Sequence, residues 1–203
     1  MTLSRARPRL RSALLLGVVS LVLLCGAAAK DWRRLITDHD RTRLHNWRTE
    51  WTDAITRARG GKAGPSIDAE GILLQPDAAI DGSPPPDGLY ACRVVKVGAQ
   101  TPLQLQFVTY PGAHCRIANG RFTKLDGSQR PHGRLYPYES GRLLFLGAMA
   151  LGDERGSLPY GRDPDRDMVG IVERIGPHRW RLVLPSPKWE SMLDVIDLVP
   201  AAS

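Results

Sequence analysis

The sequence lacks the short motifs that mark most nucleotide-binding, metal-binding and nucleophilic sites. It contains no phosphate-cradling glycine loop, no dinucleotide fingerprint and no Gly-x-Ser-x-Gly elbow. Its five histidines form no His-x-x-x-His pair and no cluster with cysteine, which are arrangements typical of zinc sites. We therefore expect neither a metal nor a cofactor, and no catalytic residue can be assigned from a motif.

Two segments resemble functional motifs but depart from them. Residues 163–167 look like the start of a calcium-binding loop, yet Met168 and Arg174 stand where that loop needs Gly and Glu. Residues 126–132 bring an acid, a hydroxyl and an imidazole close together, but a catalytic triad depends on geometry rather than on proximity along the chain. A salt-bridged surface loop and a turn are the better interpretations.

The N-terminus has the three-part layout of a secretory signal peptide. Four arginines precede an apolar stretch from Ala13 to Leu24, and Ala27-Ala28-Ala29 supplies the small residues of a cleavage site. We predict that residues 1–29 are a signal peptide and that residues 30–203 form a single exported domain, periplasmic or secreted.

Two other interpretations of the N-terminus stay open. Residues 12–29 just reach the lower length limit of a membrane-spanning helix, so the segment could remain as an anchor. Cys25 could carry a lipid, although the bulky Leu24 before it is unfavourable for such a site. In each case the arginines stay inside and the same domain is exported.

The charge of the exported part is close to balanced. The whole chain carries a formal charge of +7, and the first 29 residues contribute four arginines and no acid. The remaining 24 basic and 21 acidic residues give +3, an ordinary value for a soluble domain. We expect no nucleic-acid partner, and no stable membrane span once the signal peptide is removed.

Cysteine is scarce, and its number becomes even after cleavage. Removing Cys25 with the signal peptide leaves Cys92 and Cys115 as the only pair. In an oxidising compartment an even number of cysteines favours a disulfide. Two buried free thiols are the alternative, and their spacing argues against a redox motif.

The first part of the exported chain predicts one amphipathic helix and a connector. Residues 38–59 place apolar side chains three and four apart, with Asp38 as a plausible N-cap and Gly60-Gly61 as a stop. Residues 60–88 are rich in Pro and Gly and read as a connector, with a short helix or turn around Ile72.

From residue 89 to residue 203 the pattern is that of β-structure. Short runs of β-branched and aromatic residues alternate with turn residues, and most connections are short, which favours antiparallel neighbours. The expected fold is mainly β (α+β): a small antiparallel meander barrel or strongly curled sheet of about eight or nine strands, with the helix packed on it. An open sheet is the alternative. The expected strands are 89–97, 103–110, 114–118, 121–125, 132–137, 142–150, 168–175, 179–185 and 194–199.

Two strands carry informative face patterns. Residues 103–109 alternate apolar and polar, so one face should be wet. Residues 142–150 are apolar on both faces, and we expect the helix stripe with Trp47 and Trp51 to cover the second face. In a flat meander Cys92 and Cys115 would lie two strands apart, about 9–10 Å, which is too far for a disulfide. Either residues 111–116 form a loop that folds back, which Pro111-Gly112 would allow, or the meander is not flat there.

A barrel mouth is a common ligand site, and the polar residues expected near it define the candidate site. They are Gln129, Arg130, Tyr136, Tyr160 and Arg162. We further expect Arg130 and Arg162 to have fixed partners, as structural clasps or as anion contacts.

A set of short motifs follows in a fixed order along the chain. The most specific are Gly127-Ser128-Gln129-Arg130-Pro131 and Arg179-Trp180. The others include Asp31-Trp32, Cys92-Arg93, Cys115-Arg116, Leu135-Tyr136-Pro137, Gly152-Asp153-Glu154 and Tyr160-Gly161-Arg162-Asp163. The set resembles an uncharacterised secreted bacterial family, domain-of-unknown-function family 4893. The resemblance covers nearly the whole exported chain and implies export and a single domain, but no reaction.

Three functions remain, each with its own structural signature. The leading one is a non-enzymatic periplasmic or envelope binding module for an unknown small molecule or envelope protein, which an apolar lumen with few polar groups would support. An envelope-directed hydrolase would need two carboxylates about 5–10 Å apart in an open cleft. A secreted protein inhibitor would present the 151–167 loop on a shallow surface.

Overall fold

The computed structural model describes residues 31–201, and the predictions for the signal peptide, the anchor and Cys25 lie outside them. The helical segments are η1 (Trp32–Arg34), α1 (Asp38–Ala58), η2 (Arg59–Ala63), α2 (Gly64–Ala69), η3 (Gly71–Leu74) and η4 (Glu139–Gly141). The strands are β1 (Gly88–Ala99), β2 (Phe107–Ala118), β3 (Arg121–Lys124), β4 (Gln129–Pro137), β5 (Leu143–Leu151), β6 (Asp167–Gly176), β7 (Arg179–Pro185) and β8 (Ser191–Pro200). Among the described residues, no helix is long and apolar enough to cross a membrane.

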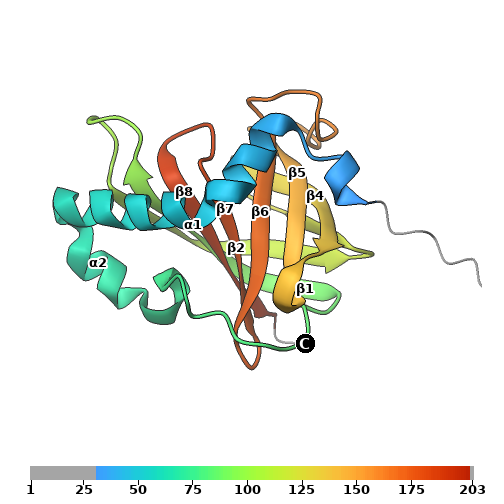
Figure 1. Cartoon of the computed structure of the whole chain (residues 1–203), viewed down its shortest axis with the longest axis horizontal. Coiled ribbons are helices and arrows are strands. Elements are labelled where there is room, and N and C mark those ends of the chain that lie inside the picture. The colour runs from blue at the N-terminus through green and yellow to red at the C-terminus, as the bar shows by residue number, and fades with distance from the viewer. Residues whose placement is uncertain (1–30, 202–203) are drawn as a thin grey trace, which may run out of the picture. The chain divides into compact units, whose positions relative to one another are not determined.

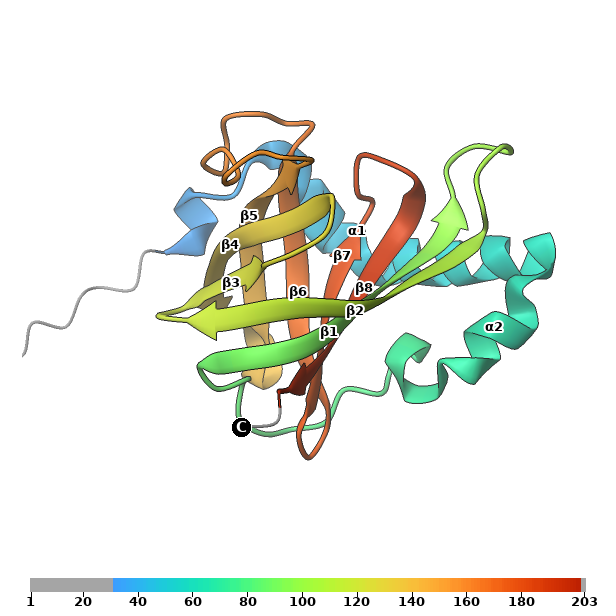
Figure 2. The same cartoon turned by 180° about the vertical axis from the view of Figure 1, so that it is seen from behind.

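The eight strands form a closed antiparallel barrel in which every strand pairs with its neighbours in sequence (Figures 1 and 2). β8 returns to β1, with Val95 opposite Val195, so no sheet edge is left open along that seam. Short turns set this order. Asn119-Gly120 joins β2 to β3 with both residues at positive φ, the conformation that a two-residue hairpin turn needs. The meander-barrel prediction is confirmed, and the open-sheet alternative is wrong.

The nine expected strands become eight because 103–110 and 114–118 belong together. β2 continues through Pro111-Gly112 with a bulge opposite Arg93, and Gly112 takes a positive φ of 75° there. The predicted strand start at 103 is also wrong, because residues 100–106 form the β1–β2 loop. Leu103 is 98% exposed at its tip, so its alternation with Gln104 reflects no buried face.

The cysteines form the expected disulfide without any folding back. Cys92 and Cys115 lie on the adjacent strands β1 and β2, with Cα atoms 5.9 Å apart. Tyr90 faces Cys115 and Cys92 faces Ala113, so the bond runs diagonally across one strand pair. The apparent distance conflict arose from counting one long strand as two.

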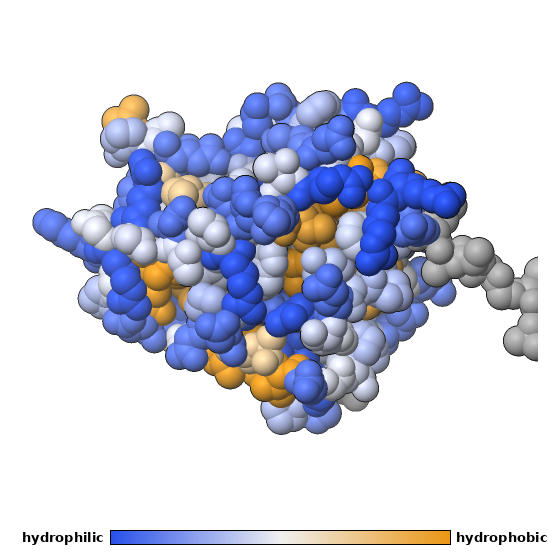
Figure 3. Space-filling model, in the orientation of Figure 1, coloured by the Kyte–Doolittle hydropathy of each residue, from blue (hydrophilic) through white to orange (hydrophobic). Residues whose placement is uncertain are grey.

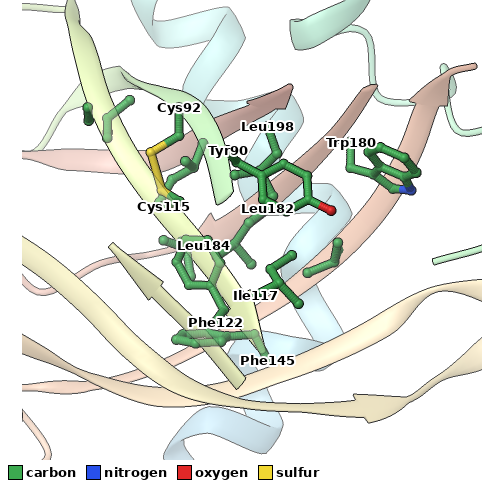
Figure 4. Packing of buried hydrophobic residues seen from close by; sticks show 14 of the residues in the cluster. Tyr90, Cys92, Cys115, Ile117, Phe122, Phe145, Trp180, Leu182, Leu184 and Leu198 are labelled. Carbon is green, nitrogen blue, oxygen red and sulfur yellow. A yellow bond between two sulfur atoms is a disulfide. The ribbon is translucent and has the colours of Figure 1, made fainter. Parts of the chain in front are cut away.

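The barrel interior is apolar and is filled at one end. Inward residues alternate along each strand with outward ones, as the two-residue period of a strand requires. Phe122 and Phe145 meet edge to face with ring centroids 5.8 Å apart. Gly133 and Gly147 leave room for the Phe145 ring, since an added Cβ at either would lie under 3 Å from ring carbon. Figure 4 shows this packing, which includes Tyr90, Ile117, Trp180, Leu182 and Leu198.

Helix α1 packs on the outside of the barrel, mainly over β1 and β6–β8 (Figure 1). Its N-cap is Thr37, one residue before the predicted cap, and Thr37 Oγ1 accepts a bond from the Asp40 backbone. Trp51 is fully buried against the outward residues Val95 and Val183. The expected cover of strand 142–150 by the helix stripe is therefore confirmed for Leu44 and Trp47, which pack with the outward residues of β5, and wrong for Trp51.

The second face of β5 is covered by the start of the helical region. Leu144 and Leu146 of β5 pack with Leu44 of α1 and with Ile36 just before it. The helix axis crosses the barrel (Figure 1), so the first half of α1, through Trp47, reaches the cluster on β5, and Trp51 one turn later packs on other strands. The face that carries α1 is largely hydrophilic, with separate hydrophobic patches (Figure 3).

Candidate ligand cavity at the open end of the barrel

The end of the barrel opposite the aromatic packing holds a cavity of about 450 Å³. The β1–β2, β5–β6 and β7–β8 connections surround this end, at the top of both ribbon views (Figures 1 and 2). Its apolar wall consists of Val94, Tyr110, Pro111, Ala113, Pro131, Met149, Leu184 and Ile196. Its polar wall consists of Lys96, Lys124, Asp126, Ser128, Gln129, Glu190 and Asp194.

The short strand β3 opens one side of this cavity. β3 pairs only with Cys115–Ala118 of the twelve-residue strand β2. The preceding part of β2, Tyr110–Gly112, therefore faces the cavity instead of a β3 neighbour. The cavity therefore opens at the side of the barrel, between β2 and the β3–β4 turn, as well as at the end of the barrel.

Lys96 is the centre of a buried ion cluster on the polar wall. Its Nζ lies 3.1 Å from Asp194 Oδ2, 3.1 Å from Glu190 Oε2 and 3.0 Å from Gln129 Oε1. Burial disfavours the charge of Lys96, but the carboxylates of Asp194 and Glu190 outweigh burial and raise its pKa. Lys96 is thus a fully paired cation that fixes β1 to β8 and to Gln129.

Lys124 lines the same cavity, but its bonding partners differ from those of Lys96. It is 7% exposed and follows Phe122 on the inward face of β3. Its Nζ donates to the backbone carbonyl of Asp126, and within the described residues no carboxylate forms an ion pair with it. Burial lowers the pKa of Lys124, and the positive charges of Arg130 and Lys96 act in the same direction against the attraction of Asp126.

The β3–β4 turn directs the carboxylate of Asp126 toward His114 rather than toward Lys124. Asp126 accepts bonds from the His114 backbone N–H at 3.1 and 3.2 Å and lies 2.7 Å from His114 Nδ1. Gly127 has a φ of 83°, and an added Cβ would stand 2.8 Å from Lys124 Nζ. The tight turn thus brings backbone, rather than a side chain, against the ammonium group.

The structure separates the five residues that the sequence grouped at a barrel mouth. Gln129 lines the cavity and binds Lys96. Arg130 is a clasp: its guanidinium donates to the carbonyls of Gly127, Gly152 and Glu154. It fixes the β3–β4 turn to the end of β5 and lies outside the cavity wall.

The other three residues do not line the cavity. Tyr136 packs on the outer face of the barrel, in the cluster that contains Ile36 and Leu44. Tyr160 donates to Asp40 Oδ2 at 2.7 Å and so fixes the β5–β6 loop to α1. Arg162 is exposed, and within residues 31–201 no side-chain bond to it is seen, so the fixed partner expected for it is absent there.

Sequence reasoning missed the two lysines and two of the acids. Lys96 follows Cys92 and Val94, and Asp194 precedes Ile196 and Leu198, each at an inward position of an apolar alternation. A charged residue in the inward register is costly unless it is paired or functional. That break in the pattern was the available signal, but it depends on knowing which face of each strand is inward.

The described residues contain no group of three or more His, Cys, Asp and Glu side chains placed to hold a metal ion. A family model described as a domain of unknown function, DUF4893, matches residues 32–198. No curated protein and no solved structure matches the chain.

Proposed function

We propose a ligand-binding function for this chain, which belongs to the DUF4893 family of domains of unknown function: it takes up a small amphipathic molecule in the open end of the barrel. The observation that carries the proposal is the cavity of about 450 Å³, which is lined by both apolar and polar side chains. That volume falls within the range of about 300–1,000 Å³ typical of small-molecule sites.

The construction of the cavity supports binding. The aromatic packing around Phe122 and Phe145 gives the cavity a closed floor, while a disulfide and a complete ring of strands make its walls rigid. A preformed cavity loses little conformational entropy when a ligand enters. The apolar wall would take the hydrocarbon part of a ligand, and the lysines and carboxylates would orient its polar end.

The two rival functions have less support. Glu190 and Asp194 both lie 3.1 Å from Lys96 Nζ, so the carboxylates that a hydrolase would need are engaged by one ammonium. The 151–167 loop is bonded back to the barrel by Arg130 of β4, which donates to the carbonyls of Gly152 and Glu154, and to α1 by Tyr160–Asp40. Such bonds suit a cap beside the cavity better than a protruding inhibitory loop.

The proposal also includes the compartment in which the protein acts. A signal peptide at residues 1–29 would deliver the domain to the periplasm or outside the cell, where its disulfide would form and persist. Binding material of the envelope or the medium is the function that fits this location.

Titration with the neutral fluorescent probe N-phenyl-1-naphthylamine tests the proposal. The probe should gain fluorescence on entering the cavity, because the apolar wall excludes water from it. Ala113→Trp, which fills the cavity from β2, should weaken probe binding by about tenfold or more, equivalent to about 1.4 kcal/mol.

Val199→Trp is the matched control. Val199 lies on β8, is exposed and does not line the cavity, so this variant should bind the probe like the wild type. Absence of saturable probe binding to the wild type, or equal binding by a folded Ala113→Trp variant, would contradict the proposal.

A further inference from the structure

The two lysines of the cavity differ in their bonding partners, and this difference indicates which ligand the cavity binds. Lys96 contacts two carboxylates and an amide oxygen. Lys124 has one backbone carbonyl as its bonded acceptor among the described residues. An ammonium has three donors, so Lys124 can offer the remaining ones to a group inside the cavity.

We propose that Lys124 is the anion-binding residue of the cavity and that the ligand is an amphipathic monocarboxylate, such as a medium-chain alkanoate. The inference rests on the proposed binding function. The ligand carboxylate accepts from Lys124 Nζ, and its hydrocarbon chain lies along the apolar wall formed by Ala113, Met149 and Ile196.

Pairing, rather than net charge, makes this site selective for an anion. The cavity wall contains two lysines and three acids, so its formal charge does not attract anions. Each acid, however, is already engaged: Asp194 and Glu190 by Lys96, and Asp126 by His114. A buried cation that has only a neutral acceptor gains more from an incoming carboxylate than a paired one does.

The groups that face Lys124 come from every neighbouring element. Lys96 on β1, Asp126 in the β3–β4 turn, Gln129 on β4, Glu190 just before β8 and Asp194 on β8 line the same cavity. Arg130 acts on Lys124 from outside the cavity wall, and His114 on β2 acts through its contact with Asp126. Burial lowers the pKa of Lys124 in this setting. A bound carboxylate would raise it again, so binding should take up protons at an alkaline pH where Lys124 is partly neutral.

Isothermal titration calorimetry with three ligands of equal chain length tests the inference: octanoate, octan-1-ol and octylammonium. Protein purified from cells that express the full-length chain should bind octanoate about tenfold or more tightly than octan-1-ol, equivalent to about 1.4 kcal/mol. Octylammonium should bind most weakly. In two buffers of different ionisation enthalpy, octanoate binding at alkaline pH should report proton uptake.

Lys124→Met should abolish both the preference for octanoate and the proton uptake, while N-phenyl-1-naphthylamine still binds. Lys124→Arg should keep the preference, because it keeps the charge. Lys188→Met is the matched control: Lys188 lies in the β7–β8 loop, pairs with Asp165 and does not line this cavity, so its loss should leave the preference unchanged.

The outcomes separate this inference from the proposed function. Equal binding of octanoate and octan-1-ol, a preference for octylammonium, or an octanoate preference that survives Lys124→Met would overturn the anion site and leave the binding function standing. Failure of all three ligands and of the naphthylamine probe to bind would overturn both.

Discussion

Several arginines of this protein donate to backbone carbonyls of other segments and so fix those segments to one another. Arg181 is fully buried, pairs with Glu173 and donates to carbonyls of the connector, among them Leu73 and Gln75. Arg43 in α1 donates to the Pro185 carbonyl at the end of β7. A planar guanidinium offers five donors in a rigid fork, which suits several carbonyls at fixed positions better than the single nitrogen of a lysine does. These contacts explain how the connector and α1 stay fixed to the barrel.

Arg130 offers a direct test of this role. Arg130→Lys keeps the charge but loses the fork that reaches Gly127, Gly152 and Glu154, so the free energy of unfolding should fall by ~1 kcal/mol. Arg162→Lys should change it by less than about 0.5 kcal/mol, the usual range for a surface substitution. Urea denaturation measures both. Equal stability of the two variants would mean that the clasp contributes nothing.

The lowered pKa of Lys124 predicts how stability depends on pH. The folded state binds this proton less tightly than the unfolded state, whose lysine titrates near the ordinary value of 10.5. Stability should therefore rise with pH from the lowered pKa up to about 10.5, and Lys124→Met should lose this rise. Denaturation of both proteins at several alkaline pH values checks the difference. A constant difference across that window would show that Lys124 is not perturbed.

At the scale of elements, Trp51 is the largest fully buried side chain that joins α1 to the barrel. Trp51 is fully buried, donates from Nε1 to the Leu74 carbonyl at 3.2 Å and lies under the Arg181 guanidinium, 4.4 Å from its ring centroid. Trp47 packs edge to face on Trp51 but is only partly buried. Burial, a hydrogen bond and a cation–π contact therefore converge on one side chain.

Trp51→Ala should destabilise the protein by ~3–5 kcal/mol through the cavity and the lost contacts. Trp47→Ala should cost less than about half of that, because a partly exposed ring has less apolar area to lose. Chemical denaturation followed by far-UV circular dichroism measures both. A cost below about 1 kcal/mol for Trp51→Ala would mean that α1 is not anchored by this contact.

The disulfide joins β1 to β2 beside the bulge at Arg93. Cys92 and Cys115 are 23 residues apart, so the cross-link should stabilise the barrel by ~3 kcal/mol in the chain-entropy model. Denaturation of the exported protein with and without a reductant measures this value. Thiol labelling of the denatured, unreduced protein is the control, and two reactive thiols per chain would show that the bond is absent.

At the scale of the whole molecule, residues 31–201 form one barrel with its helix outside and its cavity at one end. The strand order β1 to β8 with the β1–β8 seam makes every backbone ladder continuous around the ring. At the cavity end, Lys96, Lys124 and Asp194 lie on strands, whereas Asp126, Ser128 and Glu190 lie in the connections beyond them. The opposite end is packed with aromatic side chains.

The N-terminus of the exported protein is the prediction at this scale. Sequencing should find a start at or near Lys30, because Ala27-Ala28-Ala29 follows an apolar stretch of signal-peptide length. An intact Met1 would indicate an uncleaved anchor. A lipid on an N-terminal Cys25 would indicate a lipoprotein.

Most of the fold could be predicted from local pattern. Residues 179–185 match β7, and residues 38–59 match α1 to within one residue. The errors lie where one or two residues are compatible with two different local structures. Pro111-Gly112 reads as a turn, but the twist of a barrel absorbs it as a bulge in β2. Leu103 reads as part of a buried face, but no second layer lies beyond the loop tip to cover it.

The sequence by itself determined the strand pattern, the helix and the two cysteines, because side-chain period and turn chemistry act over a few residues. Only the tertiary structure decided which residues form the cavity. Lys96, Lys124 and Asp194 come from three strands far apart in the chain, and closure of the barrel brings them together. The tertiary structure also decided the roles of Arg130 and Tyr160, because their hydrogen-bond partners depend on which loops meet at the end of the barrel. Such long-range meetings depend on register and closure, which no local pattern encodes.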